Sequence, residues 1–145
     1  MSLLKNPDFE SGRLQPGWEH GIGERVDLNV IPDTDKARTG SNYLSFRATR
    51  GQSSVKQDIQ VTMPSVTALA YVRAESNDVS GSLAIWDAPG TDNEKKISYD
   101  FTVGQTWTQI VATLGRQNPA NGPVRIEIYL DTLHSFMWID SVTAF

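Results

Sequence analysis

Polar and aromatic residues alternate with aliphatic ones near the end of the chain, in the run from Val124 to Leu130. Successive side chains of a β-strand point to opposite faces, so Arg125, Glu127 and Tyr129 share one face. An aromatic ring beside a guanidinium and a carboxylate can pack on a sugar ring and hydrogen-bond its hydroxyl groups. The run therefore predicts a sugar-binding strand. Alternating polar residues are also common on a strand face that only meets solvent, and that alternative stays open.

Three further strand-like runs offer outward side chains of the same kind. Alternation in Ser82–Asp87 makes Trp86 point outward, and an outward tryptophan on a strand needs a ligand or a covering loop. The runs Ser53–Val61 and Lys96–Phe101 alternate as well, and the second places Tyr99 in the core. If these strands form one sheet with the Val124 run, we expect a floor that bears Trp86, Tyr129, Glu127, Arg125, Lys56, Asp58, Ser98 and Asp100.

A second pair of candidate groups lies at the two ends of the chain. The segment Asn6–Gly12 predicts a brief edge strand that buries one ring and carries Glu10. The closing run Phe136–Phe145 is also strand-like and carries a single acid, Asp140. If the first and last strands lie side by side, these two carboxylates meet at one rim and repel unless a cation or a donor lies between them.

The elements that must position these groups are all β-strands. Short runs with period-two alternation, separated by clusters of Gly, Pro, Asn and Asp, predict an all-β fold: a two-sheet antiparallel β-sandwich. No repeat or linker divides the chain, so we expect one domain over residues 4–145, with residues 1–3 as an expression leader. The expected strands are Arg25–Ile31, Asn42–Thr49, Ser53–Val61, Val66–Glu75, Gly81–Asp87, Lys95–Val103, Thr106–Leu114, Val124–Leu130 and Phe136–Phe145.

Four short motifs, in their order and spacing, resemble the jelly-roll carbohydrate-binding modules of the family 4, 9 and 22 type. They are the Asn6–Gly12 opening with Trp18, the small polar segment 37–41, the strand 54–61 and the closing run 138–142. The resemblance covers essentially residues 4–145. It implies a galactose-binding-like jelly roll, a ligand on the concave sheet and a packing role for Trp18. It also implies that Tyr129 and Glu127, on the penultimate strand, contact the sugar.

The resemblance further implies a structural calcium ion at the rim formed by Glu10 and Asp140. Calcium takes about six to eight oxygen ligands and tolerates a mixture of carboxylate and backbone groups. We expect the carbonyl groups to come from Asp8 or Ser11 and from the turn between Arg38 and Ser41. In the alternative, Glu10 accepts a backbone N–H or pairs with the arginine of that turn, and Asp140 caps a turn.

Composition and motifs exclude several other classes. The 145 residues carry a formal charge of −4 with scattered Lys and Arg, which disfavours a nucleic-acid surface, and no apolar run reaches membrane-spanning length. There is no cysteine, and His20 and His134 are isolated, which disfavours a catalytic metal. A glycosidase needs two carboxylates at a set separation, and the spacing selects no pair among Asp58, Asp87, Asp100 and Glu127. We expect no catalytic residues.

The sequence therefore predicts a non-catalytic module that binds a polysaccharide or oligosaccharide. We expect a monomer, secreted as part of a larger protein and joined in the same chain to a glycoside hydrolase or lyase, whose local concentration on substrate it raises. An acidic polysaccharide could be held by Lys56, Arg125 and Lys96. The alternative is a spacer or protein-interaction domain of an extracellular or phage protein, with no sugar site.

Overall fold

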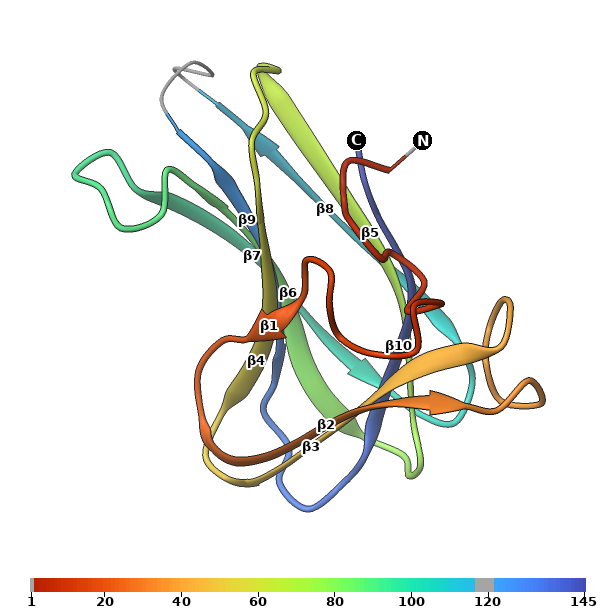
Figure 1. Ribbon diagram of the computed structural model, residues 1–145. Helices are drawn as coiled ribbons and strands as arrows, with labels where there is room; N and C mark the ends of the chain where they lie inside the picture. The colour runs from red at the N-terminus through yellow and green to blue at the C-terminus, as the bar shows by residue number, and fades with distance from the viewer. Residues whose placement is uncertain (1, 117–121) are drawn as a thin grey trace.

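The chain forms two five-stranded antiparallel sheets packed face to face (Figure 1). The structure is a computed structural model and describes residues 2–116 and 122–145, so Met1 of the expected leader lies outside the described residues. The described residues contain no helix, and hence none long enough to cross a membrane. The predicted all-β jelly-roll sandwich is confirmed.

The two sheets have interleaved connectivity, and each takes strands from both halves of the chain. The first sheet runs, in spatial order, β1 (Glu19–His20), β4 (Ser53–Ile59), β9 (Val124–Leu130), β6 (Val79–Asp87) and β7 (Lys95–Val103). The second runs β2 (Glu24–Pro32), β3 (Asn42–Arg50), β10 (Met137–Ala144), β5 (Ser65–Ala74) and β8 (Thr108–Gly115).

Alternating aliphatic side chains make the core between the sheets. On β9, Val124, Ile126 and Ile128 are fully buried, as are the alternate residues of β5 that face them from the second sheet. Burying such a side chain stabilises the fold by about 1.5–3 kcal/mol. The predicted burial of Tyr99 is wrong. This residue is 54% exposed because β7 is an edge strand whose middle the opposite sheet leaves uncovered.

The N-terminal segment closes one side of the sandwich beside β10. It forms turns instead of the predicted edge strand, yet the main chain of Pro7 still accepts a hydrogen bond from the Val142 N–H (2.8 Å). Ser2 and Leu3 of the expected leader also hydrogen-bond to the Ala144 backbone. The ends of the chain therefore lie together (Figure 1).

Two buried aromatic rings anchor this segment. Phe9 and Trp18 are 0% and 1% exposed, with ring centroids 5.7 Å apart, and the Trp18 indole N–H donates to the Asn6 carbonyl (2.9 Å). The predicted burial of Phe9 and packing role of Trp18 are confirmed.

A bulge in β10 changes which side chains face the core. Ser141 has a positive φ of 52°, and the register with β5 shifts between Asp140 and Thr143. Strict alternation would place Trp138 and Val142 on the same face. The extra residue turns Val142 into the core and leaves Trp138 on the outer face of the second sheet.

Candidate functional site

The cross-strand register gathers the predicted floor residues on the outer face of the first sheet. We call this surface the platform. Its outward side chains form three rows across β4, β9, β6 and β7. The rows are Asp58, Arg125, Trp86 and Lys96, then Lys56, Glu127, Ala84 and Ser98, and finally Ser54, Tyr129, Ser82 and Asp100. The prediction that these four strands form one sheet is confirmed.

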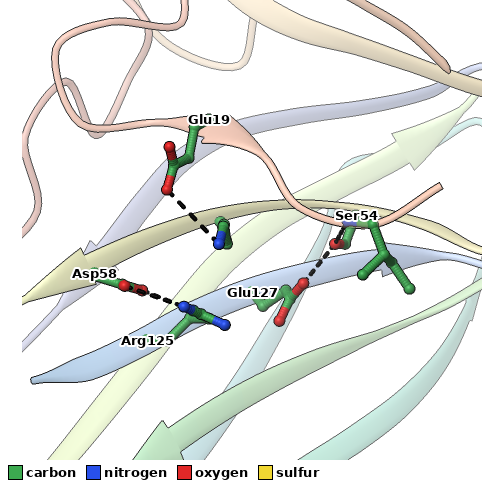
Figure 2. Close-up of polar contacts among 7 residues, drawn as sticks. Glu19, Ser54, Asp58, Arg125 and Glu127 are labelled. Atoms are coloured by element: carbon green, nitrogen blue, oxygen red, sulfur yellow. Dashed lines mark hydrogen bonds and ion pairs between the residues drawn. The ribbon is translucent and has the colours of Figure 1, made fainter. Parts of the chain in front are cut away.

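Ion pairs order one end of the platform. Arg125 donates from Nε to Oδ1 of Asp58 (2.7 Å) and from Nη2 to Oδ2 (3.2 Å), and the Asp58 hydrogen bond raises the pKa of the guanidinium. Lys56 Nζ lies 3.7 Å from a carboxylate oxygen of Glu19 on β1 (Figure 2). The Arg125 and Asp58 side chains remain 24% and 39% exposed, so a ligand can reach this fixed pair.

Glu127 lies beneath a close crossing of the backbone. Its side chain accepts a hydrogen bond from the Ser54 hydroxyl (2.5 Å, Figure 2), and the residue is only 3% exposed. A Cβ on Gly21, just after β1, would stand 2.7 Å from Oε2 of Glu127 and would collide with Ser54. Glycine at this position therefore lets the chain cover the carboxylate.

Tyr129 is covered as well. It is 5% exposed, and Lys96 Nζ lies 5.1 Å from its ring centroid. Burial raises the pKa of the Tyr129 phenol, and the hydrogen-bonding Glu127 carboxylate raises it further. Both outward side chains are therefore covered by other parts of the chain, and the phenol keeps its proton.

Trp86 is partly exposed in the first row of the platform, between Arg125 and Lys96. Lys96 Nζ lies 4.8 Å from its ring centroid, and the ammonium forms no ion pair with an acid of the described residues. The indole Nε1–H is buried beside the Tyr129 phenol, whose pKa it lowers, and it forms no well-aligned hydrogen bond with an acceptor of those residues. Buried donors normally have partners, so a ligand or water oxygen could take up this N–H if the side chains covering it moved aside.

A shallow pocket lies at each end of the platform. One, of about 380 Å³, adjoins Asp58 and Glu19, and the other, of about 320 Å³, adjoins the exposed Asp100 and Asp131. Asp87, one of the acids weighed for hydrolysis, is not on the platform, because it forms a buried ion pair with Arg116.

The Glu10 carboxylate accepts backbone hydrogen bonds from the C-terminal half of the turn between β2 and β3. Its Oε1 accepts the Ser41 N–H (2.5 Å) and its Oε2 accepts the Asn42 N–H (2.9 Å). Gly40 has a positive φ of 62° and packs so closely on the carboxylate that a Cβ would overlap it. The Asp8 side chain accepts the Glu10 N–H (3.3 Å), and Ser11 bonds to carbonyl groups within its own loop.

The Asp140 carboxylate accepts backbone hydrogen bonds from the N-terminal half of the same turn. Its Oδ2 accepts the N–H groups of Arg38 (2.9 Å) and Thr39 (3.1 Å), and its Oδ1 accepts the Ser141 N–H (2.7 Å). Burial, reinforced by the nearby Glu10 charge, raises the pKa of Asp140 from its ordinary 3.8 to about 6. We call Glu10, Asp140 and residues 38–42 the carboxylate clasp.

In the clasp, Glu10 accepts backbone N–H groups and Asp140 caps the turn, which are the contacts expected in the alternative to a calcium site. The pairing of Glu10 with Arg38 is wrong, because the guanidinium carbon lies 3.3 Å from the ring centroid of Tyr71. Neither clasp carboxylate forms an ion pair with Lys or Arg in the described part of the chain.

Comparison with known proteins establishes the fold. No protein-family model and no curated protein matches the sequence. TmCBM61 in complex with beta-1,4-galactotriose matches with a TM-score of 0.72 and 19% identity, over 100% of this chain and 98% of that one. The CBM22-1 xylan-binding domain from Paenibacillus barcinonensis Xyn10C matches with a TM-score of 0.73 and 14% identity, over 94% and 89%.

A domain of bacteriophage CBA120 tailspike protein 4 has the same fold. It matches 99% of this chain with a TM-score of 0.76 and 15% identity, and the match spans 21% of the tailspike chain. The predicted resemblance in fold to carbohydrate-binding modules is confirmed, and at these identities the likeness concerns the fold alone.

Proposed function

We propose that the platform binds a polysaccharide without chemically altering it. The observation that carries this proposal is the Trp86 indole, which is partly exposed, makes no well-aligned N–H hydrogen bond within the described residues, and stands across from the fixed guanidinium of Arg125. Two proteins of the same fold are described with galactotriose or as xylan-binding, which supports a sugar ligand. The domain would be secreted and would hold an attached hydrolase or lyase on its substrate.

Binding requires one local movement. Lys96 swings off the rings, so that a pyranose packs its C–H face on Trp86. The sugar hydroxyls then accept from the indole N–H and from Arg125, and donate to Asp58. Glu127 and Tyr129 fix the floor beneath the ligand.

Replacing Trp86 with alanine should weaken binding about 10- to 30-fold, because truncating an aromatic anchor costs roughly 2 kcal/mol. Affinity electrophoresis on xylan, β-glucan, mannan, galactan, alginate and cellulose measures this. Tyr99→Ala is the matched control, since this exposed aromatic lies on the same sheet but outside the platform.

If the Trp86→Ala variant is retarded as strongly as the wild type, the sugar site lies outside the platform. If the wild type is retarded on none of the polymers, the rival function gains: a spacer or protein-contact domain. The tailspike match is the observation that favours this second candidate.

The clasp is also a candidate calcium site. Two carboxylates converge on one turn without a Lys or Arg partner among the described residues, and Ca²⁺ would bind if the backbone N–H groups that now donate to them turned away and carbonyl oxygens completed its ligands. Glu10 and Asp140 would be its side-chain ligands, with carbonyl groups from Asp8 or Ser11 and from Arg38 to Ser41. The ion would neutralise the carboxylates and tie the N-terminal segment, the turn and β10 together.

A further inference from the structure

The outer face of the second sheet, opposite the platform, carries a second group of aromatic rings. Trp138 on β10 stands directly across from Arg73 on β5, and the rings of Trp138 and Tyr43 on β3 are 5.5 Å apart. Tyr71 and Trp107 flank them and are partly exposed. We call these four rings, with the cations Lys36, Arg38 and Arg73, the cationic aromatic surface.

Each of the three cations lies over a ring. Lys36 Nζ lies 5.6 Å from the Trp138 centroid, and Arg38 lies 3.3 Å from the Tyr71 centroid. Arg73 lies between two indoles, 4.8 Å from Trp138 and 5.8 Å from Trp107. The rings take the faces of these groups, so hydrogen bonds to a ligand would come from the Lys36 ammonium and the guanidinium edges, where Arg38 Nη1 already donates to Oγ of Ser141 (3.5 Å).

None of these cations forms an ion pair within residues 2–116 and 122–145. Arg73 Nε is buried and has no acceptor there. Three acids adjoin this surface: Asp33, which accepts the Asp35 N–H (3.0 Å), the exposed Asp35 itself beside Lys36, and Asp140, which lies buried under the turn. In a chain of net charge −4, this surface gathers three cations without a salt bridge in the described residues, and Asp33 and Asp35 offset part of their charge.

The loop that carries two of the cations is held in place before any ligand binds. Trp107 Nε1 donates to the Lys36 carbonyl (3.1 Å), and the N–H groups of Arg38 and Thr39 donate to Asp140. Little loop ordering is then needed on binding, which lowers its entropic cost.

We propose that the cationic aromatic surface is a second, independent binding site, for a polysaccharide that bears carboxylate or sulfate groups. The anionic group would accept from Arg73, Arg38 and Lys36, and the sugar ring would pack on the exposed parts of Tyr71 and Trp107. The choice of a polysaccharide over an acidic peptide rests on the proposed function of the domain.

The test uses the double variant Lys36→Gln/Arg38→Gln, whose side chains are both exposed and whose backbone bonds to Asp140 remain. The affinity for polygalacturonate and dextran sulfate at low salt should fall about tenfold for each charge removed. Added salt should also lower the affinity of the wild-type protein for these polymers. Trp86→Ala should leave this binding unchanged. The matched control is Lys5→Gln/Arg50→Gln, which removes two exposed charges elsewhere.

Several results would overturn the second site. One is the absence of binding to either anionic polymer, and another is an equal loss in the control variant. Loss in Trp86→Ala but not in Lys36→Gln/Arg38→Gln would place the anion on the platform. Equal binding of poly-glutamate would show a surface for acidic proteins and overturn the sugar assignment. Retardation on neutral polymers reports on the platform separately, so failure of one site is distinguishable from failure of the other.

Discussion

Arg116→Ala is expected to lower the free energy of unfolding by about 3–5 kcal/mol. The Arg116 side chain is 0% exposed and donates from Nε to Oδ1 of Asp87 (3.0 Å), from Nη1 to the Val61 carbonyl (2.7 Å) and from Nη2 to the Gly122 carbonyl (3.0 Å). Alanine would leave the Asp87 carboxylate, 10% exposed, without its counter-charge and both carbonyl groups without their donor. Urea unfolding curves measure the loss.

The platform provides the matched control for this prediction. Arg125→Ala breaks the same kind of Arg–Asp pair at the surface, where such pairs contribute about 0–1 kcal/mol. The double variant Arg116→Ala/Asp87→Ala should recover part of the stability lost in Arg116→Ala, because it also removes the buried charge. Equal losses in the two single arginine variants would show that burial of the Arg116 pair has no energetic consequence.

In the absence of calcium, stability should fall as the pH rises from about 4 to about 7. The pKa of Asp140 is about 6 in the folded protein and ordinarily 3.8, so the folded state holds this proton more tightly. The stability from this group is fully present below pH 3.8 and is lost as the pH rises through 6. A difference of about two pKa units corresponds to roughly 3 kcal/mol. Thermal unfolding in chelator, compared with Asp140→Asn, isolates this group.

Calcium should reverse that trend if the clasp binds it. The ion favours the ionised carboxylate, so the calcium-induced rise in melting temperature should be large at pH 7 and small at pH 5. Glu10→Gln and Asp140→Asn should both abolish it, whereas Asp131→Asn, an exposed acid elsewhere, should retain it. A calcium response that survives in both clasp variants would exclude the clasp as the calcium site.

The sequence predicted the platform because strand alternation is a strong constraint. A slip of one residue would turn Arg125, Glu127 and Tyr129 into the core, so burial of the aliphatic residues fixes which face they share. The prediction that these three residues share a surface with Trp86 also required the four strands to form one sheet. The jelly-roll resemblance implied that sheet. Local alternation and the resemblance together therefore accounted for the fold.

Features made by loops and irregular backbone were beyond this reasoning. No residue pattern indicates that Gly21 crosses Glu127, that Lys96 covers Trp86, or that a bulge follows Asp140. The cationic aromatic surface was missed for the same reason. Alternation turns Tyr71 and Arg73 outward on the sheet opposite the platform, but no pattern indicates that the loop bearing Lys36 lies over Trp138.

The most direct test of the platform is the set of four tryptophan indole N–H signals in a ¹H–¹⁵N spectrum recorded during titration with a neutral oligosaccharide of the polymer that retards the protein. We predict that the Trp86 indole signal shifts most, because its N–H gains an acceptor, together with backbone amides of β6 and β9. Trp18 should not respond, since its indole already donates within the core. A saturable titration that shifts the Trp107 and Trp138 signals and leaves Trp86 unchanged would contradict a sugar site on the platform.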